Sequence, residues 1–371
     1  MQVYKRISLN FVFFHFMIKK KYRIIILLLL IPAIAWAQAG RGVYSFLDLP
    51  ASSRLAALGG SNVSLFDHDV NFVFRNPALL TPMTDKVLGL NYANYLADIN
   101  FGSAVYGMNF GEKIYMAFGV QYFDYGKFLY KTETNENPNG GDAATYFGAK
   151  DLALYVSYAC PLTERITVGG TFKPIFSSYE QYTSFGFAID AGVSYVDEKG
   201  LFSAGLVFRN VGTQIKGYYS DEDGQHYEPL AFDIQLGATQ KLPHAPLRFS
   251  LTLHNLHQWN LRYQSTNQKN SSFATENNSK DNKIGFFDMA FRHAIIGIEL
   301  VPNNNFYISA GYNHRRRQEL DMNGFRSLAG FSFGAGVKVY KFQVGFGMTQ
   351  FQVGLNSYQF SISTSLNEFR L

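Results

Sequence analysis

Apolar and polar residues alternate in segments of about ten residues along most of the chain after residue 80. The segment 358–363 reads Tyr-Gln-Phe-Ser-Ile-Ser, and the segment 331–339 reads Phe-Ser-Phe-Gly-Ala-Gly-Val-Lys-Val. A period of two places successive side chains on opposite faces of an extended strand. The pattern therefore predicts strands with one large, aromatic face and one small, polar face.

Fourteen such segments can be placed, and an even number is typical of single-chain bacterial membrane barrels. Their predicted ranges are 86–92, 101–110, 113–123, 151–160, 165–176, 184–196, 201–209, 231–240, 246–255, 293–301, 305–313, 329–339, 341–349 and 357–366.

The connections between these segments alternate in length after the first strand. The short ones are 111–112, 161–164, 197–200, 241–245, 302–304 and residue 340. The long ones include 124–150, 210–230, 256–292 and 314–328, which are rich in Asn, Ser, Asp, Gly and Lys. Short periplasmic turns opposite long external loops are expected of an outer-membrane barrel.

A soluble β-sandwich is the alternative fold for alternating strands. Its polar face would meet water and carry many Lys, Glu and Thr residues, whereas here that face carries Gly, Ser, Ala and Gln. Charged residues are only 16% of the chain, against about a quarter in soluble domains. We therefore predict an all-β fold, a transmembrane antiparallel barrel of about fourteen strands whose closure pairs all backbone groups in lipid.

The chain begins with a basic and then apolar leader. Basic residues within 19–23 precede the apolar run 24–31, which leads to Ala35-Trp36-Ala37. The run is shorter than the roughly 20 residues that span a bilayer, and the pattern is that of a secretory signal peptide. We predict that residues 1–37 direct export to a Gram-negative outer membrane, with Met1 or Met17 as the start.

The stretch 38–84 precedes the predicted barrel, residues 85–371, and differs from it. A short helix is expected over 53–58, ended by Gly59 and Gly60, because glycine readily ends helices. A turn is expected at Asn76-Pro77-Ala78. The stretch has too little apolar mass to fold alone, and we predict that it fills the lumen as a plug, for which a fourteen-stranded barrel has room.

Motifs for catalysis, cofactors or metals give little support. The segment 330–334 matches Gly-x-Ser-x-Gly, but it lies within an alternating strand rather than at a strand-to-helix turn. Asp67-His68-Asp69 lacks obvious further ligands, and the single cysteine, Cys160, excludes an intrachain disulfide. We expect a protein that is not an enzyme, with no catalytic, cofactor-binding or metal-binding residues.

Two features of the sequence, a basic run and a set of glycines, predict contact with other molecules or with other segments of the chain. The basic run Arg315, Arg316 and Arg317 lies in a predicted external loop, either solvated or in contact with anionic lipopolysaccharide or an acidic partner. The formal charge of +5 is modest and indicates no nucleic acid. Glycines within 334–347 line the predicted lumen, where they would let another part of the chain approach the wall or leave a narrow ligand path.

Three stretches before the first strand carry a family resemblance. The segments 42–47 and 50–60, together with Asn76-Pro77-Ala78 and the following two leucines, resemble the PorV–PorQ family of type IX secretion barrels from Bacteroidetes, on its PorQ side. The Asn-Pro-Ala step is shared with FadL-like barrels, which have fourteen strands and an N-terminal hatch in the lumen. The resemblance therefore implies a structural hatch motif of Gly59, Gly60, Asn76, Pro77 and Ala78.

The resemblance also implies a function, with rivals that the residues do not separate. The implied role is to anchor a PorZ-like surface protein in an attachment complex with the sortase PorU and with PorV. A FadL-type transporter of hydrophobic small molecules and a PorV-like shuttle that binds cargo signals share the same barrel and plug. A partner is expected to dock on the external loops 210–230 and 256–292, because loops of that length are usually functional or disordered.

Overall fold

The computed structural model describes residues 42–95, 99–111, 113–130, 145–220, 224–261, 285–303, 305–320, 328–352 and 355–369. The predicted signal peptide, residues 1–37, lies outside the described residues. Within them, helices are all too short or too polar to cross a membrane.

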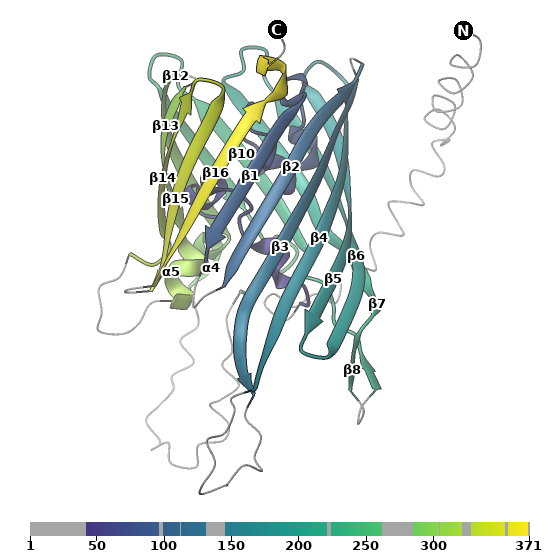
Figure 1. Ribbon diagram of the computed structural model, residues 1–371. Coiled ribbons are helices and arrows are strands. Elements are labelled where there is room, and N and C mark those ends of the chain that lie inside the picture. Colours follow the sequence, from purple (N-terminus) through teal and green to yellow (C-terminus); the bar gives the residue numbers. More distant parts are fainter. Residues whose placement is uncertain are drawn as a thin grey trace, which may run out of the picture. The chain divides into compact units, whose positions relative to one another are not determined.

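Fourteen antiparallel strands close into one barrel (Figure 1), which confirms the predicted fold class. They are β1 (Val87–Asn94), β2 (Asn100–Phe110), β3 (Ile114–Tyr130), β4 (Thr145–Pro161), β5 (Ile166–Tyr179), β6 (Tyr182–Val196), β7 (Phe202–Lys216), β10 (Asp233–Lys241), β11 (Leu247–Leu253), β12 (Ala294–Asn303), β13 (Phe306–Asn313), β14 (Phe331–Val339), β15 (Phe342–Gln352) and β16 (Leu355–Ser365).

Each barrel strand pairs with the next one along the chain, and β1 closes the sheet against β16. The closing ladder runs from Val87 opposite Ser365 to Asn94 opposite Tyr358. Closure leaves no sheet edge, so the backbone groups along the wall are satisfied within the protein. The short strands β8 (Tyr218–Ser220) and β9 (Gly224–His226) form a separate hairpin after β7.

All fourteen predicted strands are present, but several predicted loops are partly wrong. The ladder of β3 and β4 takes up both ends of the predicted loop 124–150, at 124–130 and 145–150, where Phe128 and Phe147 stack with ring centroids 5.3 Å apart. The predicted loop 210–230 begins with the end of β7 and holds the β8–β9 hairpin, and the loop 256–292 ends in helix α4 (Phe286–Arg292). The turn between β5 and β6 is only Glu180 and Gln181, so loop lengths alternate less strictly than predicted.

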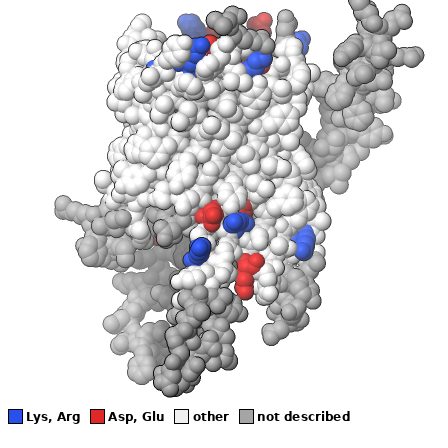
Figure 2. All heavy atoms as spheres, viewed as in Figure 1, with Lys and Arg blue, Asp and Glu red and all other residues white. Residues whose placement is uncertain are grey.

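The outer face of the wall is an apolar band. The outward aromatic side chains of Phe118, Phe346 and Phe360 are 44%, 38% and 49% exposed. Figure 2 shows that charged side chains on this face of the molecule lie toward the two ends of the barrel, with an uncharged band between them. Such a band is the surface that membrane barrels present to lipid.

The hatch, defined here as residues 42–86, lies inside the barrel, where Figure 1 shows its purple and dark blue ribbon behind β1 to β3. It consists of short helices joined by turns rather than strands. They are η2 (Ser45–Asp48), α3 (Ser53–Ala57), η3 (Val70–Phe74), η4 (Pro77–Leu79) and η5 (Pro82–Thr84). Its apolar side chains form two buried clusters, and the larger one includes inward-facing wall residues such as Phe101 and Phe123.

Candidate functional site: the hatch and its ion-pair latch

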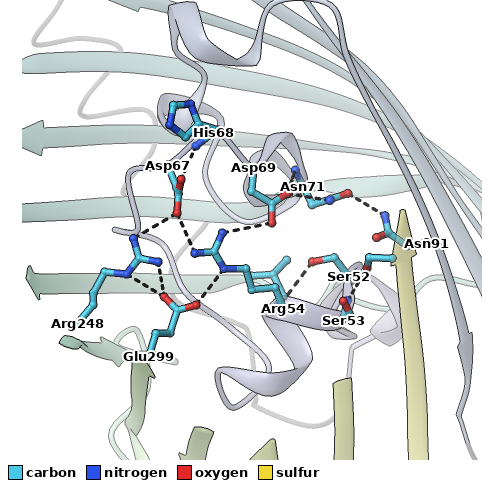
Figure 3. Close-up of polar contacts among 12 residues, drawn as sticks. Ser52, Ser53, Arg54, Asp67, His68, Asp69, Asn71, Asn91, Arg248 and Glu299 are labelled. Carbon is cyan, nitrogen blue, oxygen red and sulfur yellow. Dashed lines mark hydrogen bonds and ion pairs between the residues drawn. The ribbon is translucent and has the colours of Figure 1, made fainter. Parts of the chain in front are cut away.

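Arg54 on α3 is the central residue of an ion-pair cluster between the hatch and the wall (Figure 3). Its Nε donates to Glu299 Oε1 at 2.9 Å, and its Nη2 donates to Asp67 Oδ2 at 2.8 Å. Its Nη1 lies 3.7 Å from Asp69 Oδ2. The arginine side chain is only 4% exposed, so these carboxylates replace the water that the guanidinium loses on burial.

The wall contributes the other half of this cluster. Arg248 on β11 and Glu299 on β12 are opposite each other in the ladder, and Arg248 Nε donates to Glu299 Oε2 at 2.8 Å. Arg248 Nη1 also donates to Asp67 Oδ2 at 3.2 Å. Asp67 and Glu299 each contact both arginines, whereas Asp69 contacts only Arg54. We call this ion-pair cluster the latch: Arg54, Asp67, Asp69, Arg248 and Glu299.

The two hatch carboxylates of the latch are not equivalent. Burial by itself would raise the pKa of Asp67, but Arg54 and Arg248 outweigh it and lower the pKa below its ordinary value. Burial raises the pKa of Asp69, because its more distant contact with Arg54 compensates less. Asp67 is therefore the carboxylate whose ionised form contributes more to holding the hatch.

A second polar contact fixes the other part of the hatch. Arg75 donates from Nη2 to the carbonyl oxygens of Asp48 and Gly60, at 2.8 and 2.9 Å. Arg209 on β7 donates to Asp48 Oδ1 at 3.2 Å and to the carbonyl oxygen of Leu47 at 2.9 Å. Burial, together with the neighbouring Arg209, lowers the pKa of Arg75 to about 9.

Wall glycines make room for α3, which is one of the two interpretations that the sequence left open. A Cβ at Gly347 would lie 2.3 Å from the carbonyl oxygen of Ser53, and one at Gly334 would lie 2.5 Å from Ala57 Cβ. A Cβ at Gly345 would lie 2.7 Å from Ser53 Oγ. Close approach of the hatch therefore accounts for these glycines.

The predicted hatch motif lies in the lumen. Gly59 and Gly60 follow α3 with φ of 89° and 103°, a region in which glycine is favoured. Asn76 begins η4: its Oδ1 accepts from the Ala78 amide at 3.0 Å, and its Nδ2 donates to the carbonyl oxygen of Val63 at 2.8 Å. Pro77 is at the first position of η4, where its missing N–H costs nothing.

The three arginines of the candidate external contact lie on α5 (His314–Leu320) rather than in a loop. All three are half-buried. Arg315 pairs with Glu319 at 2.7 Å, and the guanidinium of Arg316 lies 4.9 Å from the ring centre of Phe351. Their contact with an anionic surface stays a prediction, and Arg316 is the least available for it.

A cavity of about 520 Å³ lies beside the latch, at the barrel end with the short turns. Latch residues form part of its lining, and further basic side chains come from Lys241, Lys338 and Lys341. Asp67-His68-Asp69 also faces this cavity, but the described residues contain no cluster of ligands suited to a metal ion.

The latch is the part of the site that the sequence analysis missed. Arg248 and Glu299 occupy the polar phase of their strands as isolated charges, and Arg54 is 245 positions from Glu299. The signal available in the sequence was the presence of charged residues on a lumen face made mostly of small, uncharged residues. Such residues need partners when buried.

Comparisons with known proteins agree with this architecture. No protein-family model matches the sequence, and a search of curated proteins gives no match. The crystal structure of the Pseudomonas putida toluene transporter TodX is similar, with a TM-score of 0.51 and 12% identity over 86% of this chain and 99% of that chain. The Ralstonia pickettii toluene transporter TbuX gives a TM-score of 0.46 with 13% identity, over 86% of this chain and 98% of that chain. The likeness to TodX concerns the fold alone: this chain is a closed fourteen-stranded antiparallel barrel, and the hatch lies in its lumen.

Proposed function

We propose that this protein is an outer-membrane channel for small hydrophobic molecules, gated by its hatch, and not an enzyme. The observation that carries the proposal is the latch: discrete ion pairs hold the hatch beside a cavity of about 520 Å³. The apolar outer band supports placement in a membrane. TodX and TbuX, which share this general architecture, are described as toluene transporters.

Beside the latch and the shared apolar cluster, polar groups that can exchange partners join the hatch to the wall. Ser64 Oγ and Thr239 Oγ1 are 2.8 Å apart, and Ser332 Oγ donates to the carbonyl oxygen of Ala57 at 2.9 Å. The Ser53 amide donates to Ser361 Oγ at 2.9 Å. Hydrogen bonds of this kind contribute only about 0.5–1.5 kcal/mol each, so these contacts add little resistance to a local shift of the hatch, and the latch is the stronger restraint.

A disulfide between hatch and wall tests this gating. We would replace Ser64 and Thr239 with cysteine, since their hydroxyls already touch, in a background in which Cys160 is serine. Ser157→Cys with Thr171→Cys is the matched control, because these hydroxyls are also 2.8 Å apart but join two wall strands.

Uptake of a hydrophobic probe into proteoliposomes is the readout. We expect the hatch-to-wall disulfide to stop uptake, reduction to restore it, and the wall-to-wall disulfide to leave it unchanged. Equal uptake by the oxidised and reduced forms of the hatch-to-wall variant would show that the hatch does not gate.

A second candidate function is the anchoring role implied by the resemblance to the PorQ side of its family. The many hatch-to-wall contacts equally suit a fixed plug, and the β8–β9 hairpin offers a surface beyond β7 at the long-loop end. The partners would be a PorZ-like surface protein, PorU and PorV. A PorV-like shuttle for cargo signals would use the same surface.

Affinity purification from detergent-solubilised outer membranes separates these functions. A channel is expected to purify without a stoichiometric surface protein and to show probe uptake. An anchor would retain a surface protein and show no uptake with either cysteine pair, reduced or oxidised.

A further inference from the structure

A hollow of about 380 Å³ lies on the outer face of the wall, across β3 to β7 and toward the end with the long loops. Outward-pointing side chains line it, with apolar residues at its base and two lysines on it. They are Tyr122, Leu152, Phe176 and Phe185, with Lys150 and Lys216.

An irregularity in the wall accompanies the hollow. The ladder between β6 and β7 shifts register at Phe185 and Gly186. A bulge of this kind bends a strand and locally increases its twist. Across the base of the hollow, Leu152 lies opposite Phe176 and Phe176 opposite Phe185. A second register shift, between Asp124 and Lys127 in the ladder of β3 and β4, lies beside Lys150. The hollow therefore lies between two irregular places in the wall.

The two lysines are available to an anion. Both side chains are exposed, and Lys216 Nζ donates to Thr183 Oγ1 at 2.7 Å, which keeps it on this face. Lys150 forms no ion pair with any residue that the structure describes. Asp124 is opposite Lys150 in the ladder, but one of its oxygens accepts from a backbone amide two residues further on.

One further acidic residue, Asp151, borders the hollow, but its carboxylate does not point into it and would not repel an anion bound there. Asp151 is only 2% exposed. Its carboxylate accepts hydrogen bonds from the hydroxyls of Tyr125 and Tyr179, at 2.6 and 3.0 Å, and from Ser177. Asp151 alternates with the outward-facing Lys150 and Leu152, so its carboxylate points to the opposite side of the wall.

The positions of the lysines relative to the membrane identify the ligand. Strands β4 to β7 are successive neighbours, so Lys150 and Lys216 are three strand spacings apart, about 14 Å. Both lie toward the ends of their strands that lead to the long loops, and in an outer-membrane barrel these loops are external. The apolar base then faces acyl chains of the outer leaflet, and the lysines face its phosphate-bearing headgroups.

We infer that this hollow is a binding site for lipopolysaccharide, with acyl chains on the aromatic base and phosphates on Lys150 and Lys216. Lysine binds phosphate as a point charge, and a pair of lysines above an apolar groove complements an anionic glycolipid. This inference depends on the proposed outer-membrane location but not on the proposed transport, because a lipid on the outer wall occupies neither the lumen nor the hatch.

Native mass spectrometry of the barrel in neutral detergent tests the site by counting retained lipids during titration with lipopolysaccharide or phosphatidylethanolamine. The test variant is Lys150→Glu with Lys216→Glu. The control is Lys113→Glu with Lys199→Glu, which reverses two exposed charges in short turns at the opposite end. Heat-modifiable mobility on gels checks that each variant is folded.

We expect the test variant to lose about tenfold or more in affinity for lipopolysaccharide, and the control to change by less than about twofold; tenfold corresponds to about 1.4 kcal/mol. Phosphatidylethanolamine is expected to bind both variants alike. Equal losses in the folded test and control variants would overturn the site, and so would binding of phosphatidylethanolamine as tight as that of lipopolysaccharide. Failure of the transport experiment would leave this result unaffected.

Discussion

At the scale of single residues, the hatch depends on charges that are costly to bury alone. Arg54 lies between Asp67 and Glu299 and also stacks 4.7 Å from the ring centre of Tyr307. Removing a closely paired member such as Glu299 leaves an uncompensated buried charge, which costs about 3–5 kcal/mol for a fully buried pair. The latch therefore holds the hatch in one position mainly because the partially broken cluster is unfavourable.

Neutralising the two hatch carboxylates one at a time should give unequal effects. The pKa of Asp67 is lowered in the folded protein, so its ionised form stabilises the docked hatch, and Asp67→Asn removes that contribution. The pKa of Asp69 is raised, so its ionised form is disfavoured there, and Asp69→Asn costs little. We expect amide hydrogen exchange in α3 to accelerate about tenfold or more in the first variant and less than about threefold in the second. The reverse order would contradict this account of the latch.

The latch also marks a limit of prediction from sequence at this scale. Alternation placed Arg248 and Glu299 on the lumen face, but their pairing depends on the register between β11 and β12. Their meeting with Arg54 depends further on the path of the hatch. Neither the register nor that path follows from residue types alone, because many alignments of small polar residues are equally compatible with a lumen.

At the scale of elements, the strands were the predictable part. A membrane-facing strand must be apolar on its outer face along the whole length that crosses the membrane. The alternation of apolar and polar residues therefore identified all fourteen strands. Outside the membrane a strand needs no apolar face, and β3 and β4 continue there as a ladder through residues that were predicted to form a loop. The short helices α4 and α5 were missed for a related reason: seven residues are too few to show a helical period clearly.

The fit between α3 and the wall gives a prediction at this scale. Gly347→Ala places a Cβ about 2.3 Å from the backbone oxygen of Ser53, a contact that requires the helix to move. We expect it to undock α3 at a cost of about 1–3 kcal/mol, measured as faster protease cleavage within the hatch. Gly102→Ala is the control, because its nearest atom, the Asn91 carbonyl oxygen, is at an ordinary 3.5 Å. Equal cleavage of the two variants would show that the glycine is not needed for close approach.

At the scale of the whole molecule, the chain combines an apolar outside with a polar, protein-filled inside. The outward aromatic band requires lipid or another apolar medium around the wall. The lumen is occupied by the hatch, whose charged and hydroxyl groups meet complementary groups of the wall. A soluble barrel has the opposite arrangement, with a polar outside and an apolar inside. Both proposed functions depend on the apolar outside and the polar, hatch-filled inside of this barrel.

Tryptophan quenching by brominated lipid tests this arrangement most directly, in a background in which Trp36 and Trp259 are phenylalanine. A single tryptophan replaces either Phe346, on the outer wall, or Phe72, which is buried in the hatch. In vesicles with brominated acyl chains, we expect strong quenching of the tryptophan at position 346 and little quenching at position 72. Equal quenching at both positions, or none at 346, would contradict a barrel with lipid outside and its hatch inside.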